Sequence, residues 1–80
     1  MNKLLVFSAT WCGPCKAFKP TLLQLDQDRL SYIDIDELPE IREDYNVKSV
    51  PTIVLVDEDG EELERFVGAQ PLSKLQELLA

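Results

Sequence analysis

The sequence predicts an α/β fold of one domain, residues 1–80, in which a four-stranded mixed sheet is flanked by helices in the order βαβαββα. Short apolar runs of strand length alternate with segments whose apolar residues recur at helical spacing, which is typical of a partly parallel sheet. The pair Asp59-Gly60, between the last two strand patterns, indicates a tight hairpin turn. We therefore expect the first two strands to be parallel, with a right-handed helical crossover, and the hairpin to run antiparallel beside them.

The first strand and the first helix follow from two apolar patterns. Residues 3–8, KLLVFS, are short and mostly apolar, which is typical of a strand buried on both faces. A helical pattern begins at Cys12, where apolar residues recur at spacings of three and four. This stripe consists of Cys15, Phe18, Leu22 and Leu25. Pro20 falls inside the helix, where it removes a backbone donor and is expected to produce a kink.

The second strand and helix have weaker patterns. Residues 30–35, LSYIDI, alternate polar and apolar side chains in part and predict a strand. Pro39 suits an early position of a short helix that carries Ile41 and Tyr45.

The last three elements are a hairpin and a helix. Residues 52–56, TIVLV, form the strongest strand pattern in the chain, and residues 62–67 predict the returning arm. Pro71 then opens a final helix whose apolar side chains are expected to face inward. Those side chains are Leu72, Leu75, Leu78 and Leu79.

The chain is acidic, with eight Lys and Arg residues against fifteen Asp and Glu residues and a net charge of −7. Such a surface repels phosphate backbones and anionic lipids, so roles on nucleic acid or membranes are disfavoured. Acidic residues gather at 34–44 and 57–64, whereas Lys16 and Lys19 follow the two cysteines. Solubility is the simplest explanation of the acidity, but the charge near the thiols is expected to be positive.

The N-terminal segment helps to predict the cellular compartment of the protein. No apolar run approaches the roughly 20 residues needed to cross a bilayer. Lys3 followed by apolar residues imitates a secretion signal, but the stretch 4–7 is shorter than the roughly 7–15 residues of a signal core. We interpret this segment as a strand and expect the protein to be cytoplasmic.

Both cysteines lie in the stretch ATWCGPCKAFKP, residues 9–20, with two residues between them. A zinc site is disfavoured because it needs at least three protein ligands, and the chain has two cysteines and no histidine. We therefore expect no metal and no cofactor. A structural staple is also disfavoured, because so small a loop gains only about 2 kcal/mol and cytosolic conditions keep such thiols reduced.

A redox couple accounts for more features of this stretch. Cys12 falls at the helix start, where unpaired N–H groups and the helix dipole favour an anion. Lowering a thiol pKa from about 8.5 to about 7 needs roughly 2 kcal/mol, which the dipole and one hydrogen bond can supply. Gly13 and Pro14 allow a sharp entry into the helix, and Cys15 follows one turn later on the buried stripe. We expect an exposed attacking thiolate at Cys12 and a sheltered resolving thiol at Cys15.

The motif WCGPCK, residues 11–16, resembles the active-site motif of the thioredoxin family. The similarity includes the helix-kinking Pro20, residues 50–52 as a cis-proline loop, residues 67–69 as a glycine turn, and residues 34–36 closing the middle strand. The resemblance implies a thioredoxin-like fold, truncated because the family's first strand and helix have no counterpart in this sequence.

The sequence departs from the family pattern beneath the cysteines. Thioredoxins usually carry a buried aspartate six residues before the first cysteine, paired with a lysine on the next strand. The corresponding positions here are Val6 and Tyr32, and Ser8 occupies the place of a family tryptophan. The proton of Cys15 must therefore go to water, to the departing substrate thiolate or to another carboxylate.

The resemblance also implies an activity, the reduction of protein disulfides by Cys12 and Cys15. It implies disulfide-containing client proteins as partners, thioredoxin reductase or glutathione as the electron donor, and a monomer. It further implies a substrate-binding rim around the cysteines. The rim consists of Trp11, Gly13, Pro14, Val50, Pro51 and Gly68.

Two alternatives remain open from the sequence. One is a glutaredoxin-like protein recharged by glutathione, for which a tyrosine in the middle of the motif would have argued, whereas Gly13-Pro14 argues the other way. The other is a binding module whose thioredoxin-like surface clamps a partner without redox turnover. Full biological activity of a Cys12→Ser variant would support the binding module.

Overall fold

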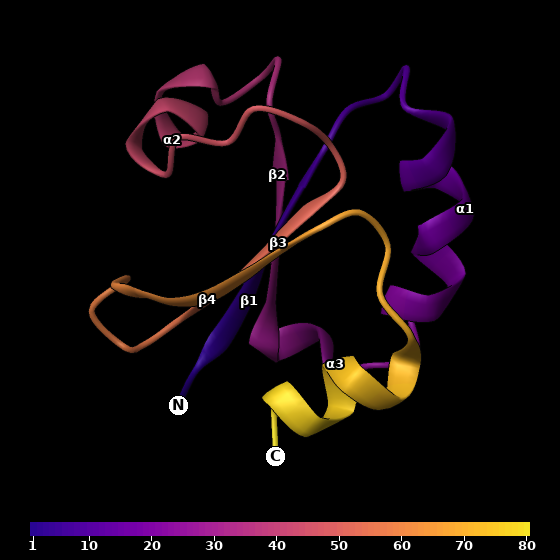
Figure 1. Cartoon of the computed structure of the whole chain (residues 1–80), viewed down its shortest axis with the longest axis vertical. Coiled ribbons are helices and arrows are strands. Elements are labelled where there is room, and N and C mark those ends of the chain that lie inside the picture. Colours follow the sequence, from indigo (N-terminus) through magenta and orange to yellow (C-terminus); the bar gives the residue numbers. More distant parts are fainter.

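Four strands form one mixed sheet in the computed structural model of the chain, which describes residues 1–80 (Figure 1). The strand order across the sheet is β2-β1-β3-β4. The strands are β1 (Lys3–Ser8), β2 (Leu30–Asp34), β3 (Thr52–Val56) and β4 (Glu62–Val67). β1 is parallel to β2 and antiparallel to β3, and β3 is antiparallel to β4. This arrangement confirms the predicted mixed sheet, including the parallel first pair and the antiparallel hairpin.

Helices cover both faces of the sheet (Figure 1). α1 (Gly13–Leu22) and α3 (Leu72–Leu78) lie on one side, and α2 (Pro39–Asp44) lies on the other. A short 3₁₀ helix, Gln27–Arg29, precedes β2 and was not predicted. None of the helices is both long enough and apolar enough to cross a membrane.

The core consists of two clusters, one on each face of the sheet, because successive side chains of a strand point to opposite faces. Leu4 and Val6 of β1 pack with Phe18, Leu22 and Leu75 from α1 and α3. On the opposite face, Phe7 packs with the two cysteines and with residues of the α2 side. The half-buried members of that second cluster are Leu5, Ile41, Tyr45 and Val50. The predicted inward stripe of α1 is confirmed for Cys15, Phe18 and Leu22; Leu25 is also buried, but α1 ends before it.

The side chain of Arg29 joins the two ends of the chain to the sheet. Its Nε and Nη2 donate to the Asn2 carbonyl at 3.0 and 2.9 Å, and its Nη1 donates to the Leu79 carbonyl at 2.6 Å. A guanidinium with several fixed donors suits this role, because it satisfies carbonyls of two elements at once. Arg29 therefore anchors the start of β1 and the end of α3 to each other.

β2 ends at Asp34, one residue before the predicted end. The carboxylate of Asp34 accepts a hydrogen bond from the Asp36 amide at 2.8 Å, which turns the chain out of the strand. This turn brings Asp36 toward the start of α1.

The ion pair between Glu62 and Arg65 on β4 gives a pH-dependent prediction. Arg65 donates to both carboxylate oxygens, at 2.8 and 2.6 Å, and it also donates to the Tyr45 carbonyl at the end of α2. These hydrogen bonds lower the pKa of Glu62. Both side chains are about one-third exposed, so we expect the pair to add no more than about 0.5 kcal/mol to the unfolding free energy.

Because the folded-state pKa of Glu62 is lowered, this contribution is present above the unfolded pKa of about 4.3 and disappears as the pH falls through the folded value. Urea unfolding of the parent and of Glu62→Gln should therefore differ slightly at neutral pH and coincide in strong acid. A difference that persists unchanged in acid would contradict this assignment.

Candidate redox site

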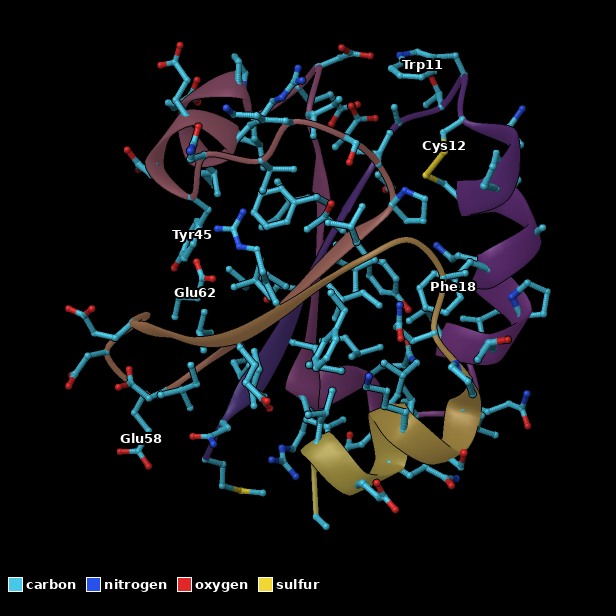
Figure 2. All side chains as sticks on the ribbon, viewed as in Figure 1. Trp11, Cys12, Phe18, Tyr45, Glu58 and Glu62 are labelled. Carbon is cyan, nitrogen blue, oxygen red and sulfur yellow. A yellow bond between two sulfur atoms is a disulfide. The ribbon has the colours of Figure 1, made fainter.

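The two cysteines form a disulfide at the start of α1 (Figure 2). Their Cα atoms lie 5.2 Å apart, within the range that such bonds require. Cys12 is the N-cap residue of the helix, with extended backbone angles, and its sulfur accepts a hydrogen bond from the Cys15 amide at 3.1 Å. Pro14 lies in the first turn, where no backbone donor is needed. The predicted position of Cys12 at the helix start is confirmed.

The sequence predicts an exposed Cys12 and a sheltered Cys15, and this prediction is wrong for the disulfide form of the protein. Cys12 is 4% exposed and Cys15 is 9% exposed, so neither sulfur is freely accessible. The physical reason is that the Cys12 sulfur caps the first turn of the helix and lies 3.8 Å from the Val50 carbonyl oxygen. The loop before β3 therefore covers Cys12 from the opposite side.

The predicted rim residues lie on three segments around the disulfide. Gly13 and Pro14 are exposed at the start of α1. The Val50-Pro51 peptide bond is cis, and Val50 is half-buried beside Cys12. Gly68, in the left-handed region at φ 92°, donates its amide to the Pro51 carbonyl at 2.8 Å. The turn after β4 thus supports the proline loop.

Trp11 lies on the surface next to Cys12 (Figure 2). Its side chain is 66% exposed, and the indole Nε1 donates to the Asp36 carboxylate at 2.9 Å. This bond fixes the ring at the rim while leaving its face open, as a recognition surface requires. Sequence reasoning placed Asp36 at the end of the middle strand but missed its bond to Trp11, because nothing local in the sequence pairs two residues 25 positions apart.

Val67 is a second rim residue that sequence reasoning missed. It is 67% exposed at the end of β4, and its Cα partner in the sheet is Thr52, which follows Pro51. The local sequence shows a valine in a strand but does not show that its side chain is exposed. That exposure follows from the position of β4 at the edge of the sheet.

The apolar Val6 of β1 lies next to Cys15, with which it lines one cavity. Val6 is 1% exposed, and its Cα partner across β1 and β2 is Tyr32. This pairing fits the positions that the resemblance assigned to the family's aspartate and lysine. Val6, Tyr32 and Cys15 line a small cavity of about 70 Å³. Burial raises the pKa of the Tyr32 phenol, against a hydrogen bond to Gln27 that lowers it, so Tyr32 is neutral near pH 7.

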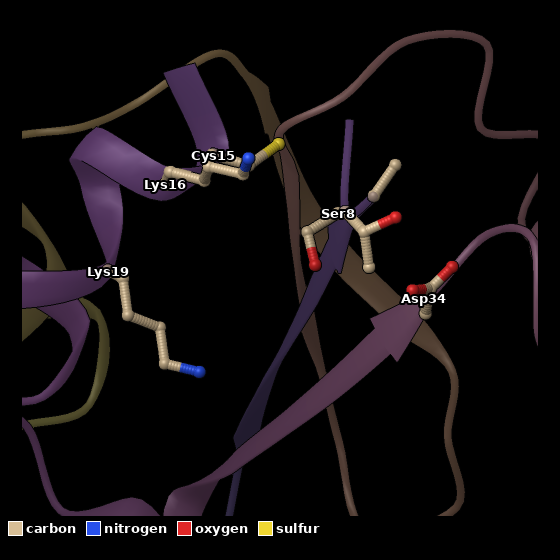
Figure 3. A pocket seen from close by; sticks show the side chains of 7 residues that line it. Ser8, Cys15, Lys16, Lys19 and Asp34 are labelled. Carbon is tan, nitrogen blue, oxygen red and sulfur yellow. The ribbon is translucent and has the colours of Figure 1, made fainter. Parts of the chain in front are cut away.

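A larger cavity of about 370 Å³ opens beside Cys15 (Figure 3). Five of its seven lining residues are polar or charged, and these include two cations and one carboxylate. The lining residues are Ser8, Ala9, Thr10, Cys15, Lys16, Lys19 and Asp34. Lys16 and Lys19 provide the expected positive charge near the thiols. Asp34 adds a negative charge to the same cavity, and the sequence did not indicate this position for it. No group of three or more His, Cys, Asp or Glu side chains is arranged to hold a metal ion.

Known proteins share this sequence pattern and architecture. A family model described as thioredoxin matches residues 1–80. Thioredoxin from Staphylococcus epidermidis is 43% identical over 82 residues, which cover 96% of this chain and 78% of that protein. Thioredoxin-2 from Pyricularia oryzae is 41% identical over 81 residues, covering 96% of this chain and 46% of that protein. The chain therefore spans about half the length of some curated relatives.

The solved structures agree with the sequence relatives. A thioredoxin mutant from Halobacterium salinarum superposes with a TM-score of 0.86 at 38% identity, over 96% of this chain and 70% of that chain. The family assignment rests on two findings: the family model matches all 80 residues, and the Staphylococcus relative is 43% identical. The chain belongs to the thioredoxin family.

Proposed function

We propose that this chain is a dithiol–disulfide oxidoreductase that reduces protein disulfides through Cys12 and Cys15. The observation that supports this most directly is the N-cap position of Cys12, whose sulfur accepts the Cys15 amide at 3.1 Å. In the reduced state this donor and the start of α1 favour a thiolate on Cys12. Membership of the thioredoxin family supports the same activity.

The reaction has two exchange steps. The Cys12 thiolate attacks one sulfur of the client disulfide, forms a mixed disulfide and releases the other client sulfur as a thiolate. Cys15 then loses its proton and attacks the Cys12 sulfur, which forms the Cys12–Cys15 disulfide and releases the second client thiolate. The client gains two electrons and the protein dithiol loses two. The two released thiolates take protons from solvent.

The rim would bind the client segment that carries the disulfide. Because the Val50 carbonyl lies 3.8 Å from the Cys12 sulfur, a client strand that pairs with the Val50 backbone would place its own sulfur beside Cys12. Trp11 precedes Cys12, and Val67 pairs with Thr52 next to Pro51; both side chains are largely exposed and offer apolar surface to a client. Gly13, Pro14 and Gly68 complete the rim without long side chains that would block an approaching chain, and Pro51 is buried next to Val50.

We propose that residues 1–80 act as a single monomeric domain in the cytoplasm. Thioredoxin reductase, or glutathione as the second candidate, would return the dithiol to its reduced form. A reducing compartment fits this role, because a disulfide reductant must itself be kept reduced.

A coupled assay tests the proposal. We expect the protein to reduce a disulfide-containing protein when it is supplied with NADPH and thioredoxin reductase, and to do so more slowly with glutathione as the donor. Cys12→Ser should abolish turnover with either donor, because the attacking sulfur is removed. Turnover that survives in Cys12→Ser would overturn the redox assignment and would favour the binding module. Faster turnover with glutathione than with the reductase would favour a glutaredoxin-like role.

A further inference from the structure

The second exchange step requires an acceptor for the Cys15 proton, and this question depends on the proposed function. A thiol must ionise before it attacks a disulfide, and burial of the Cys15 sulfur opposes ionisation. On β1 the position beneath the disulfide holds Val6, which cannot accept a proton. The acceptor must therefore lie elsewhere on the surface that surrounds Cys15.

The cavity of about 370 Å³ provides such a surface (Figure 3). It is lined by Cys15 on one side and by Ser8 and Asp34 at the ends of β1 and β2. Ser8 has a small side chain, which leaves this space open. A cavity of this size, lined by Ser8 and by three charged side chains, has room for several water molecules, each of which needs roughly 30 Å³. Water can therefore connect Cys15 to the other walls.

Asp34 is the one carboxylate that lines either cavity next to Cys15. Its Oδ1 accepts the amides of Asp36 at 2.8 Å and Glu37 at 3.4 Å, which fix the side chain at the end of β2. Its Oδ2 makes no hydrogen bond with the protein, so this oxygen is available to water in the cavity. In Figure 3 the Ser8 side chain lies between Cys15 and Asp34 in the view, where its hydroxyl can donate and accept.

The other ionisable groups that face Cys15 are not suitable acceptors. Lys16 and Lys19 are cations on α1 that favour negative charge in the cavity. The Lys19 ammonium also lies 4.3 Å from the centre of the Tyr32 ring, and the Tyr32 phenol keeps its own proton because burial raises its pKa. The Cys12 sulfur is bound to the client at this stage of the reaction.

We propose that Asp34 accepts the Cys15 proton through water in this cavity. The proton passes from the Cys15 sulfur to water, and from the water chain to the Asp34 carboxylate. The Cys15 thiolate forms the bond to Cys12 as the bond between Cys12 and the client sulfur breaks, and the client thiolate leaves with the electron pair. Asp34 later returns its proton to solvent.

Stopped-flow reaction of the reduced protein with one equivalent of 5,5′-dithiobis(2-nitrobenzoate) separates the two steps. The first release of the coloured thiolate reports the attack by Cys12, and the second release reports the attack by Cys15. In Asp34→Asn the amide oxygen still accepts the Asp36 amide, so the turn is retained while the proton acceptor is lost. We expect the second release to slow about tenfold or more near neutral pH, and the first to change less than about twofold.

The pH dependence distinguishes a proton acceptor from a structural residue. The second release in Asp34→Asn should approach the parent rate as the pH rises above the pKa of a free thiol, about 8.5, because Cys15 then ionises without an acceptor. Glu77→Gln, which removes the same charge from α3 away from the cavity, should resemble the parent throughout.

Three results would overturn this assignment. They are a second release within about twofold of the parent, an equal slowing of both releases, and a slowing that is the same at every pH. If the second release is absent from the parent protein itself, the proposed function fails instead, so the two failures are distinguishable. A first release at the parent rate in the same trace shows that the variant keeps the parent environment of Cys12.

Discussion

Replacing Cys15 with serine is expected to slow catalytic disulfide reduction about a thousandfold or more, which corresponds to about 4 kcal/mol in the activation barrier. The Cys15 amide still donates to the Cys12 sulfur in this variant, so the first attack on the client is retained. A serine hydroxyl does not displace the client from Cys12, and the reaction stops at the mixed disulfide. The protein should therefore accumulate as a covalent complex with its client.

Two measurements check this result. Intact mass analysis should show one client per Cys15→Ser molecule, held by a bond that added dithiothreitol releases. The chromogenic disulfide should release one coloured thiolate from Cys15→Ser at the stage where the parent releases two. Cys12→Ser is the matched control and should form no such complex. Sustained turnover by Cys15→Ser without external thiol would show that another group resolves the mixed disulfide.

Placing an aspartate at Val6 is expected to lower the unfolding free energy by about 3 kcal/mol at neutral pH. Val6 is 1% exposed and packs between the sheet and α1, so the new carboxylate would lose its hydration. Lys19 lines the small cavity next to Val6 and limits the penalty to this range. For a chain of this size the change corresponds to a melting-temperature drop of roughly 15 °C.

The penalty should depend on pH in a defined direction. Burial raises the folded-state pKa of an aspartate at position 6 above its unfolded value of about 3.9. Below the unfolded pKa the carboxyl is neutral in both the folded and the unfolded state, so ionisation adds no penalty. The penalty grows as the pH rises from the unfolded pKa toward the folded pKa. Val6→Asn is the control, because the amide has a similar shape and no charge. Parallel pH profiles of Val6→Asp and Val6→Asn would show that position 6 is solvated.

Val6→Asp also bears on the proton route. A carboxylate at position 6 lines the small cavity shared with Cys15, so resolution in this variant should depend less on Asp34. In the double variant Val6→Asp, Asp34→Asn, the second thiolate release should be faster than in Asp34→Asn alone. This comparison uses the same stopped-flow trace as the single variants.

Most of the fold was predictable because its patterns are local. The strands Lys3–Ser8, Thr52–Val56 and Glu62–Val67 are apolar or alternating runs that end at turn residues, and their predicted bounds are confirmed. The 3₁₀ helix Gln27–Arg29 was missed because it is a single capped turn without apolar periodicity. The anchoring by Arg29 could not be predicted, since its carbonyl partners lie 27 and 50 residues away in sequence.

The candidate site likewise has features that the local sequence predicts and features that it does not. The helix cap at Cys12 follows from the short motif itself, because Pro14 suits the first turn of a helix and so places Cys12 just before that turn. The low exposure of Cys12 depends on the loop at Val50, and the bond between Trp11 and Asp36 depends on a turn after β2. These features arise where separate segments meet, so no local pattern in the sequence indicates them.

The anchoring of both chain ends by Arg29 has a practical consequence. It holds the two termini near one another at the end of the molecule opposite the disulfide, as Figures 1 and 2 show. A peptide tag, a fused partner or a bead attached at either end would leave the redox face directed toward solution. The domain is therefore suited to immobilisation as a solid-phase reductant, in which trapped clients are collected by simple washing.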